Sequence, residues 1–307
     1  MQQTRRLYQI DAFTNRAFSG NPAGVVANAE GLTEAQMQAI ARELNNSETA
    51  FLLPPQGPDH DLQVRFFTPK TEVPTCGHAT ISAHYVRALE GAPAGVIRQL
   101  TGAGILPVEI EKNPEVGVRI WMTQKPATFE HILTVDQRGK LLRALNLSAE
   151  ALATFGEVQV VSTGHSKVMI PLQSRAALEA LRPDLAILST LSAELGCNGY
   201  YPFTLDAPSV GTFSSGRMFA PAIGIAEDPV TGNAAGPLGA YLLRTGLIVI
   251  GADERVTFVA GQGETMGRPG SVLVEVARSS PRAAIGVRIA GQAVAVFQSE
   301  LEVEPWP

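Results

Sequence analysis

The chain has 307 residues and an ordinary globular composition, with 45% hydrophobic and 17% charged residues. Its length is about twice that of a typical domain, which favours two domains. The net charge of -5, with Lys and Arg scattered along the chain, gives no basic stripe for a nucleic-acid partner. We find no secretory signal and no apolar run that approaches the about 18 residues of a spanning helix, so we expect a cytoplasmic protein without a membrane partner.

The first elements along the chain are predicted as strands at 7–10, 23–26 and 64–67 and a helix at 33–44 with Thr33 as its N-cap. Residues 77–89 have apolar side chains near helical spacing and little charge, which predicts a mostly buried helix, and 232–247 repeat this type. Strands rich in β-branched residues follow each of them. Each half is therefore expected to be a helix wrapped by a curved sheet.

The two halves of the chain resemble each other. The sharpest match joins 67–79 to 219–234, because both read Phe-x-Pro and then Glu-x-Pro-x-x-Gly-x-Ala, with three extra residues in the second copy. Three further pairs keep the same order at nearly constant offset: 19–26 with 163–170, 43–45 with 194–196, and 102–110 with 261–276. Chance matches would scatter, so we infer a duplication whose copies face each other across a cleft, where ligand sites are common.

Both predicted buried helices begin in the same way. An acidic residue and a proline precede Gly77-His78-Ala79 in one copy and Gly232-Asn233-Ala234 in the other. Free N–H groups and the positive end of the helix dipole make such a start an anion site, and two of them would hold a carboxylate. The alternative is that Asp228 merely caps its helix and the glycines only allow a tight turn. The symmetric pairing favours the functional interpretation.

Glu48 lies between the end of a predicted helix and an apolar strand. A lone acidic residue at such a place is usually a solvated loop charge. Its counterpart in the second copy is approximately Gly199, so only one copy carries the carboxylate. This asymmetry indicates a single acid/base that shuttles a proton.

Several other side chains could take part in chemistry. His78 could donate to a substrate carboxylate or act as a second acid/base, and the alternative is a structural histidine. Cys76 is the thiol candidate, although a small buried filler is the alternative, and Cys197 is interpreted as structural. His84 lies six residues beyond His78 on another helix face, so no metal pair is expected. No dinucleotide fingerprint or P-loop is present, and no cofactor is predicted.

Four motifs together resemble the PhzF family, which is named for the phenazine-biosynthesis isomerase and belongs to the diaminopimelate-epimerase-like superfamily. They are Asp11-Ala12-Phe13-Thr14 with Gly20-Asn21-Pro22-Ala23, Ser47-Glu48-Thr49-Ala50-Phe51, Cys76-Gly77-His78-Ala79-Thr80, and Glu227-Asp228-Pro229-Val230-Thr231-Gly232-Asn233-Ala234. The resemblance covers nearly the whole chain, and the motifs are highly specific in combination.

The resemblance implies an α+β fold of the diaminopimelate epimerase type. It has two pseudo-symmetric halves, each a central helix wrapped by a curved, mostly antiparallel sheet, which we place at residues 1–122 with 295–307 and at 123–294. The resemblance also implies a cofactor-independent homodimer with Glu48 as the acid/base and with His78 and Asp228 orienting the substrate. We expect the substrate to contact Cys76, Gly77, Gly232, Asn233, Ala234 and Asn21.

Departures from the family pattern limit what can be carried over. Diaminopimelate epimerases have a cysteine before each helix-starting glycine, whereas this chain has Cys76 at the first place and Thr231 at the second, which disfavours a two-thiol racemase. The phenazine enzyme has a serine where this chain has Asn233, and alanine where it has Pro229, so its substrate is not transferred. The expected function is a proton shift on a small carboxylate. The alternatives are a metabolite-binding protein with a retired site and an epimerase that uses Cys76.

Overall fold

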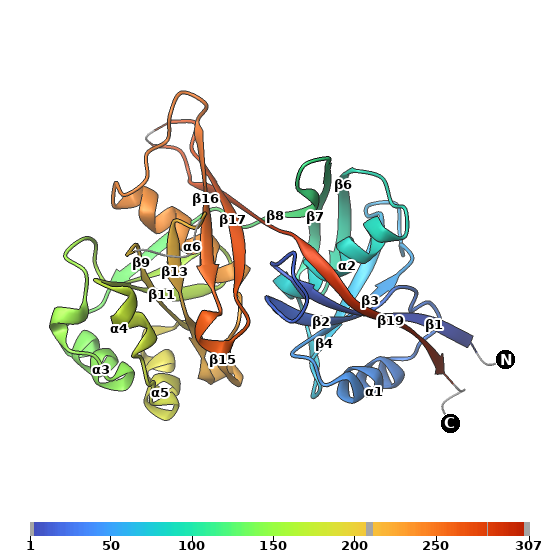
Figure 1. Ribbon diagram of the computed structural model, residues 1–307, viewed down its shortest axis with the longest axis horizontal. Coiled ribbons are helices and arrows are strands. Elements are labelled where there is room, and N and C mark those ends of the chain that lie inside the picture. Colours follow the sequence, from blue (N-terminus) through green and yellow to red (C-terminus); the bar gives the residue numbers. More distant parts are fainter. Residues whose placement is uncertain (1–2, 207–210, 281, 304–307) are drawn as a thin grey trace. The chain divides into compact units, whose positions relative to one another are not determined.

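The computed structural model describes residues 3–206, 211–280 and 282–303 (Figure 1). The chain divides into two compact units. The first consists of the residues up to Thr123 together with those from Ala290 onward, and the second is Gln124–Ile289. From the sequence, the chain was expected to re-enter the first unit at residue 295. The chain re-enters the first unit earlier than this, because strand β19 (Ala293–Val303) pairs with β1 (Gln3–Ala12) from Ala293 onward. In addition, the Phe13 N–H donates to the Gln292 carbonyl at 2.8 Å.

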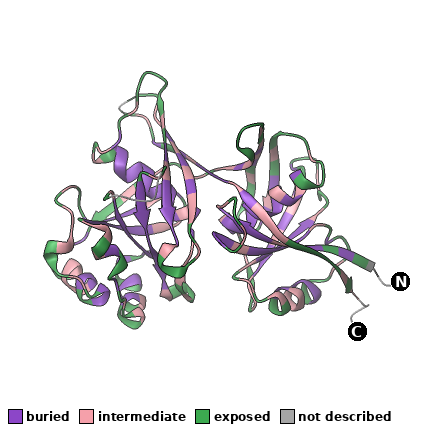
Figure 2. Ribbon diagram, viewed as in Figure 1, coloured by how far each residue is buried: buried purple, intermediate pink, exposed green. Residues whose placement is uncertain are grey.

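The first unit wraps a strongly curved sheet around one helix. Besides β1 and β19, its elements are β2 (Asn21–Val26), α1 (Glu34–Leu44), β3 (Thr49–Leu53), β4 (Leu62–Phe67), β5 (Glu72–Val73), α2 (Gly77–Leu89), β6 (Gly95–Thr101), β7 (Gly104–Asn113) and β8 (Gly117–Thr123). Neighbouring strands are antiparallel except for the β2·β3 and β4·β6 pairs, which are parallel. Helix α2 contacts β1, β2, β3, β7, β8 and β19, and nine of its residues are buried (Figure 2).

The second unit repeats this plan with two additional helices. Its elements are β9 (Thr128–Ile132), α3 (Val135–Leu145), β10 (Gln159–Ser162), β11 (Ser166–Leu172), α4 (Arg175–Glu179), α5 (Leu185–Leu195), β12 (Tyr200–Thr204), β13 (Ser214–Gly216), β14 (Met218–Ala220), β15 (Ile225–Asp228), α6 (Gly232–Arg244), β16 (Arg255–Gln262), β17 (Gly270–Ala277) and β18 (Gly286–Gly291), with short 3₁₀ helices at Ala149–Ala151, Pro221–Ile223 and Glu264–Met266. Helix α6 packs on β10, β11 and β17, as α2 does on its own sheet.

The helices predicted from periodicity are confirmed. Helix α2 has the predicted bounds, and Thr33 caps α1 with a capping box to Gln36. Helix α6 ends at Arg244 rather than at 247, because Gly246 adopts the left-handed conformation (φ 76°) and the Leu247 N–H bonds back to the Leu242 carbonyl at 2.9 Å. Within the described residues, none of the helices combines the length and apolarity that a membrane span needs.

The predicted duplication is confirmed by the pairing of the strands. In the first unit the parallel β2·β3 pair begins where the Gly24 N–H donates to the Glu48 carbonyl at 3.3 Å. In the second unit the parallel β11·β12 pair begins where the Val168 N–H donates to the Gly199 carbonyl at 2.9 Å. Glu48 and Gly199 are therefore equivalent positions of the two copies.

The two copies differ in what fills the space at this equivalent position. A Cβ atom on Gly199 would lie 2.8 Å from the Phe219 carbonyl oxygen, so no side chain fits there, and 3.4 Å from Cδ of Lys167. Lys167 comes from the neighbouring strand β11 and is 1% exposed. By the same register its counterpart in the first unit is the small residue Ala23. One copy thus has a carboxylate at the strand entrance, and the other has a buried amine beside it.

Burial is costly for the Lys167 ammonium group. Its Nζ donates a long hydrogen bond of 3.4 Å to the Ser166 carbonyl. Loss of hydration lowers the pKa of Lys167 from 10.5 to about 8, although the negative charges that Cys197 and Asp228 can carry oppose this shift. The amine therefore titrates near neutral pH.

We expect Lys167→Met to raise the free energy of unfolding at pH 7 by up to about 3 kcal/mol, which corresponds to a pKa of about 8 in the folded chain against 10.5 in the unfolded chain. The unfolded chain binds more protons at this residue between these two values, so wild-type stability should rise across that range and the advantage of the variant should shrink. Urea unfolding at pH 7 and pH 10 measures this. Lys112→Met, at an exposed position, is the control. An equal advantage of Lys167→Met at both pH values would contradict the prediction.

Candidate functional site

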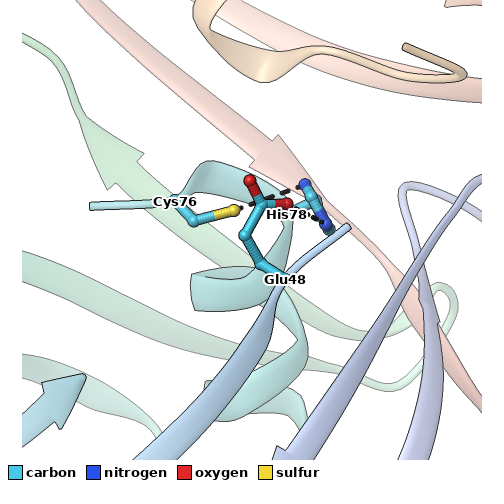
Figure 3. Close-up of side chains that lie close together, drawn as sticks. All are labelled: Glu48, Cys76 and His78. Carbon is cyan, nitrogen blue, oxygen red and sulfur yellow. Dashed lines mark hydrogen bonds and ion pairs between the residues drawn. The ribbon is translucent and has the colours of Figure 1, made fainter. Parts of the chain in front are cut away.

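Three side chains that are candidates from the sequence converge in the first unit: Glu48, Cys76 and His78 (Figure 3). Glu48 immediately precedes β3, Cys76 is the N-cap residue of α2, and His78 is in the first turn of that helix. One ligand atom from each lies within 4.8 Å of the others. The two parts of the chain meet here because α2 packs against β2 and β3.

His78 lies between the other two side chains and contacts them through different nitrogens. Its Nε2 is 3.1 Å from Ser47 Oγ and 3.3 Å from Glu48 Oε2, and its Nδ1 is 3.5 Å from Cys76 Sγ. The negative charge of the nearby Glu48 carboxylate favours the neutral-ring tautomer with its proton on Nε2, and this N–H donates to Ser47 Oγ. Nδ1 then accepts from the thiol. His78 thereby links the thiol to the carboxylate.

The carboxylate of Glu48 keeps one oxygen free of hydrogen bonds. Its side chain is 14% exposed, and Oε2 is buried. Among the described residues no group donates a hydrogen bond to this oxygen, since the 3.3 Å contact with His78 lacks hydrogen-bond alignment. A carboxylate in this state has a lone pair available for a proton from a ligand.

The two central helices differ from the other α-helices at their N-termini. The N-cap side chains of the other four, Thr33, Thr134, Ser174 and Asp184, accept hydrogen bonds from first-turn amides. Cys76 of α2 and Thr231 of α6 make no such bond within the described part of the chain. First-turn amides without a side-chain cap can bind an anion. A Cβ on Gly77 would meet nothing within 4 Å, so the space over the start of α2 is open.

Asp228 is not the N-cap residue of α6, a position that Thr231 occupies. It ends β15, and the Thr231 hydroxyl donates a short hydrogen bond to its carboxylate. The Gln262 side-chain amide donates to its backbone carbonyl at 2.7 Å. The carboxylate is therefore held in position at the end of the strand, three residues before the N-cap of the helix.

The remaining predicted substrate contacts lie at the start of α6 and in β2. The Gly232 carbonyl accepts from the Gln124 side chain at 3.1 Å, and Ala234 is buried. Asn233 has a buried Oδ1 that accepts no hydrogen bond among the described residues. Asn21 is the first residue of β2 and is 1% exposed. The structure thus groups Cys76, Gly77, His78 and Glu48 in the first unit and Asp228, Gly232, Asn233 and Ala234 in the second.

Two residues that the sequence analysis set aside are structural. His84 Nε2 pairs with Gln99 Oε1 at 2.8 Å, and complete burial lowers the pKa of His84 to about 4, so its ring is neutral. Burial raises the pKa of the Cys197 thiol, which keeps it protonated and unreactive.

Two residues were not singled out from the sequence: Ser47, which contacts His78, and Lys167, which lies beside Gly199 in the second unit. Ser47 appeared only as a letter of a motif, although its hydroxyl fixes Nε2 of His78. For Lys167 the one available signal was a lysine within the apolar run 166–172. No metal ligands are expected from the sequence, whereas Glu48, Cys76 and His78 together offer a carboxylate, a thiol and an imidazole that could hold a metal ion.

Comparison with known proteins agrees with the resemblance found in the sequence. The family model described as phenazine biosynthesis-like protein matches residues 10–299. The uncharacterized isomerase YddE of Escherichia coli is 46% identical over 97% of this chain and 99% of its own. The trans-2,3-dihydro-3-hydroxyanthranilate isomerase of Pseudomonas aeruginosa is 32% identical over 94% and 96%, respectively.

A solved structure extends this agreement to the fold. The crystal structure of a PhzF-family phenazine biosynthesis protein from Bacillus anthracis superimposes with a TM-score of 0.88 at 30% identity, over 98% of this chain and all of the other. Sequence and fold lead to the same assignment: the chain belongs to the PhzC-PhzF family of phenazine biosynthesis-like proteins.

Proposed function

We propose that this PhzF-family isomerase moves a proton between two carbons of a small carboxylate substrate, with Glu48 as the acid/base. The observation that carries the proposal is the buried Glu48 Oε2, which lacks a hydrogen bond and lies 3.3 Å from His78 Nε2. A general base needs an oxygen that is free to receive a proton, and it needs a neighbour that fixes its orientation. His78 supplies the orientation, and Ser47 holds the ring in turn.

The proposed reaction is a balanced shift. Glu48 removes a proton from a carbon that conjugation acidifies, and the electron pair moves through the conjugated system. The protonated Glu48 then returns the proton at a different carbon, so that the product is an isomer and the enzyme is regenerated. Only a single acid/base is needed, which agrees with the absence of a side chain at the equivalent residue Gly199.

The substrate carboxylate is proposed to bind at an uncapped helix start. The first-turn amides of α2, beginning at Gly77, carry the partial positive charge of the helix end and face open space. Asp228 and the start of α6 are proposed to bind the rest of the substrate. The expectations that both helix starts face one cleft and that the enzyme is a cytoplasmic homodimer stay predictions.

The second unit also suggests which groups the substrate carries. The buried Oδ1 of Asn233 can only accept, so it fits a ligand with an N–H or O–H group. The substrate of the Pseudomonas aeruginosa relative, a dihydro-hydroxyanthranilate, has a carboxylate, an amine and a hydroxyl. We therefore propose a small unsaturated carboxylate with at least one such donor.

Glu48→Gln should lower kcat by at least about 100-fold, because an amide cannot accept the proton, while ligand binding changes only a few-fold. Mass-spectrometric deuterium wash-in from heavy water measures this, with trans-2,3-dihydro-3-hydroxyanthranilate and with a bacterial metabolite extract as substrates. Glu43→Gln, on an exposed turn of α1, is the matched control and should keep full exchange. Equal exchange by Glu48→Gln and the wild type would remove Glu48 from its role. A ligand that stabilises the wild type in a thermal shift assay without any exchange would favour a binding protein.

Asn233→Ala should raise KM about three- to tenfold and change kcat less, because it removes one neutral hydrogen bond that holds the substrate. Steady-state kinetics with the substrate identified by wash-in separates the two constants. Asn15→Ala, at an exposed position, is the control. An unchanged KM in a variant that melts like the wild type would show that Asn233 does not contact the substrate.

A further inference from the structure

Glu48, Cys76 and His78 form a ligand set that no step of the proposed reaction requires as a whole. Carboxylate, thiolate and imidazole are the three ligand types of protein zinc sites. Cys76 and His78 are each 8% exposed, and the Glu48 side chain is 14% exposed, so the three donors are shielded and still accessible. The proposed proton shift uses the carboxylate of Glu48 and gives no role to the thiol of Cys76.

The spacing of the donor atoms fits one ion. Tetrahedral zinc bonds of about 2.0–2.3 Å place ligand atoms about 3.3–3.7 Å apart. Cys76 Sγ and His78 Nδ1 are already 3.5 Å apart. One donor atom of each of the three residues lies within 4.8 Å of the others, and Glu48 Oε2 is 3.3 Å from His78 Nε2, so rotation of the Glu48 side chain is needed to bring its oxygen to an ion held between Sγ and Nδ1.

The surroundings of His78 also match those of a metal ligand. A histidine that binds zinc through one nitrogen usually donates its other N–H to an oxygen, which fixes the ring. Here Nδ1 faces the thiol, and Nε2 is 3.1 Å from Ser47 Oγ. The tautomer with a proton on Nε2 is therefore compatible with the contacts of the free enzyme and also with zinc bound at Nδ1.

We propose that Glu48, Cys76 and His78 bind Zn²⁺ reversibly and that the bound ion switches the isomerase off. The second half of this statement rests on the proposed function, since zinc would take up the carboxylate lone pair that accepts the substrate proton. Three protein ligands leave a fourth position for water. A thiolate selects a soft or borderline ion, so Mg²⁺ should not compete.

The test begins with chelator-treated protein and calorimetric titration with zinc chloride. We expect one zinc ion per chain, and Cys76→Ser should weaken binding by at least about tenfold. Cys197→Ser is the matched control, because it removes the other buried thiol, which lies in the second unit and outside this group. Cobalt chloride provides a second measurement on unmodified protein: a thiolate-to-cobalt charge-transfer band that disappears when zinc is added.

The outcomes separate this proposal from the proposed function. Wild-type protein without a zinc isotherm and without the cobalt band, or Cys76→Ser with wild-type affinity, would overturn the zinc site whatever the activity of Glu48→Gln. Full deuterium wash-in at saturating zinc would overturn the switch. Loss of wash-in that a chelator restores would support it. Full activity of Glu48→Gln would refute the proposed function and leave the calorimetric and cobalt results valid.

Discussion

The hydrogen bond from the Gly24 N–H to the Glu48 carbonyl determines where the candidate site forms. It begins the parallel pairing of β2 with β3 and so fixes the last residue before β3. Glycine at position 24 leaves room for two neighbouring side chains, because a Cβ there would lie 2.8 Å from Leu44 Cδ1 and 2.9 Å from Thr49 Oγ1. Helix α2 packs against the same two strands, which brings His78 to the carboxylate. The position of the acid therefore follows from backbone pairing and not from its own side-chain contacts.

Duplication gave both units this backbone arrangement, and local packing then made them different. At Gly199 the carbonyl of Phe219 leaves no room for a Cβ, and the stem of Lys167 passes beside it. In the first unit, Ala23 has no long side chain, and Glu48 extends toward His78. An acid on one copy and a buried amine on the other suit a reaction that needs one proton carrier and not two symmetric ones.

The sequence was sufficient for features that depend on periodicity and repetition. Helix 77–89, the cap at Thr33 and the equivalence of Glu48 with Gly199 follow from local spacing and from the repeat, and the structure confirms them. Contacts made by folding were not predictable in the same way. The approach of Cys76 Sγ to His78 Nδ1 depends on side-chain rotamers, and the burial of Lys167 depends on a neighbouring strand that is distant in sequence. Spacing along the chain contains neither kind of information.

The unsatisfied groups of the molecule show where a ligand is expected. A side-chain cap is worth about 1 kcal/mol, so leaving α2 and α6 without one lowers stability by about 2 kcal/mol. Buried acceptors without donors, at Glu48 Oε2 and Asn233 Oδ1, cost more, at about 1–3 kcal/mol each. The other four α-helices are capped, so the chain does not lack suitable capping residues in general. These deficits lie at the residues that the family motifs share: a bound carboxylate would satisfy the first-turn amides of an uncapped helix, and a ligand N–H or O–H group would satisfy an unpaired acceptor.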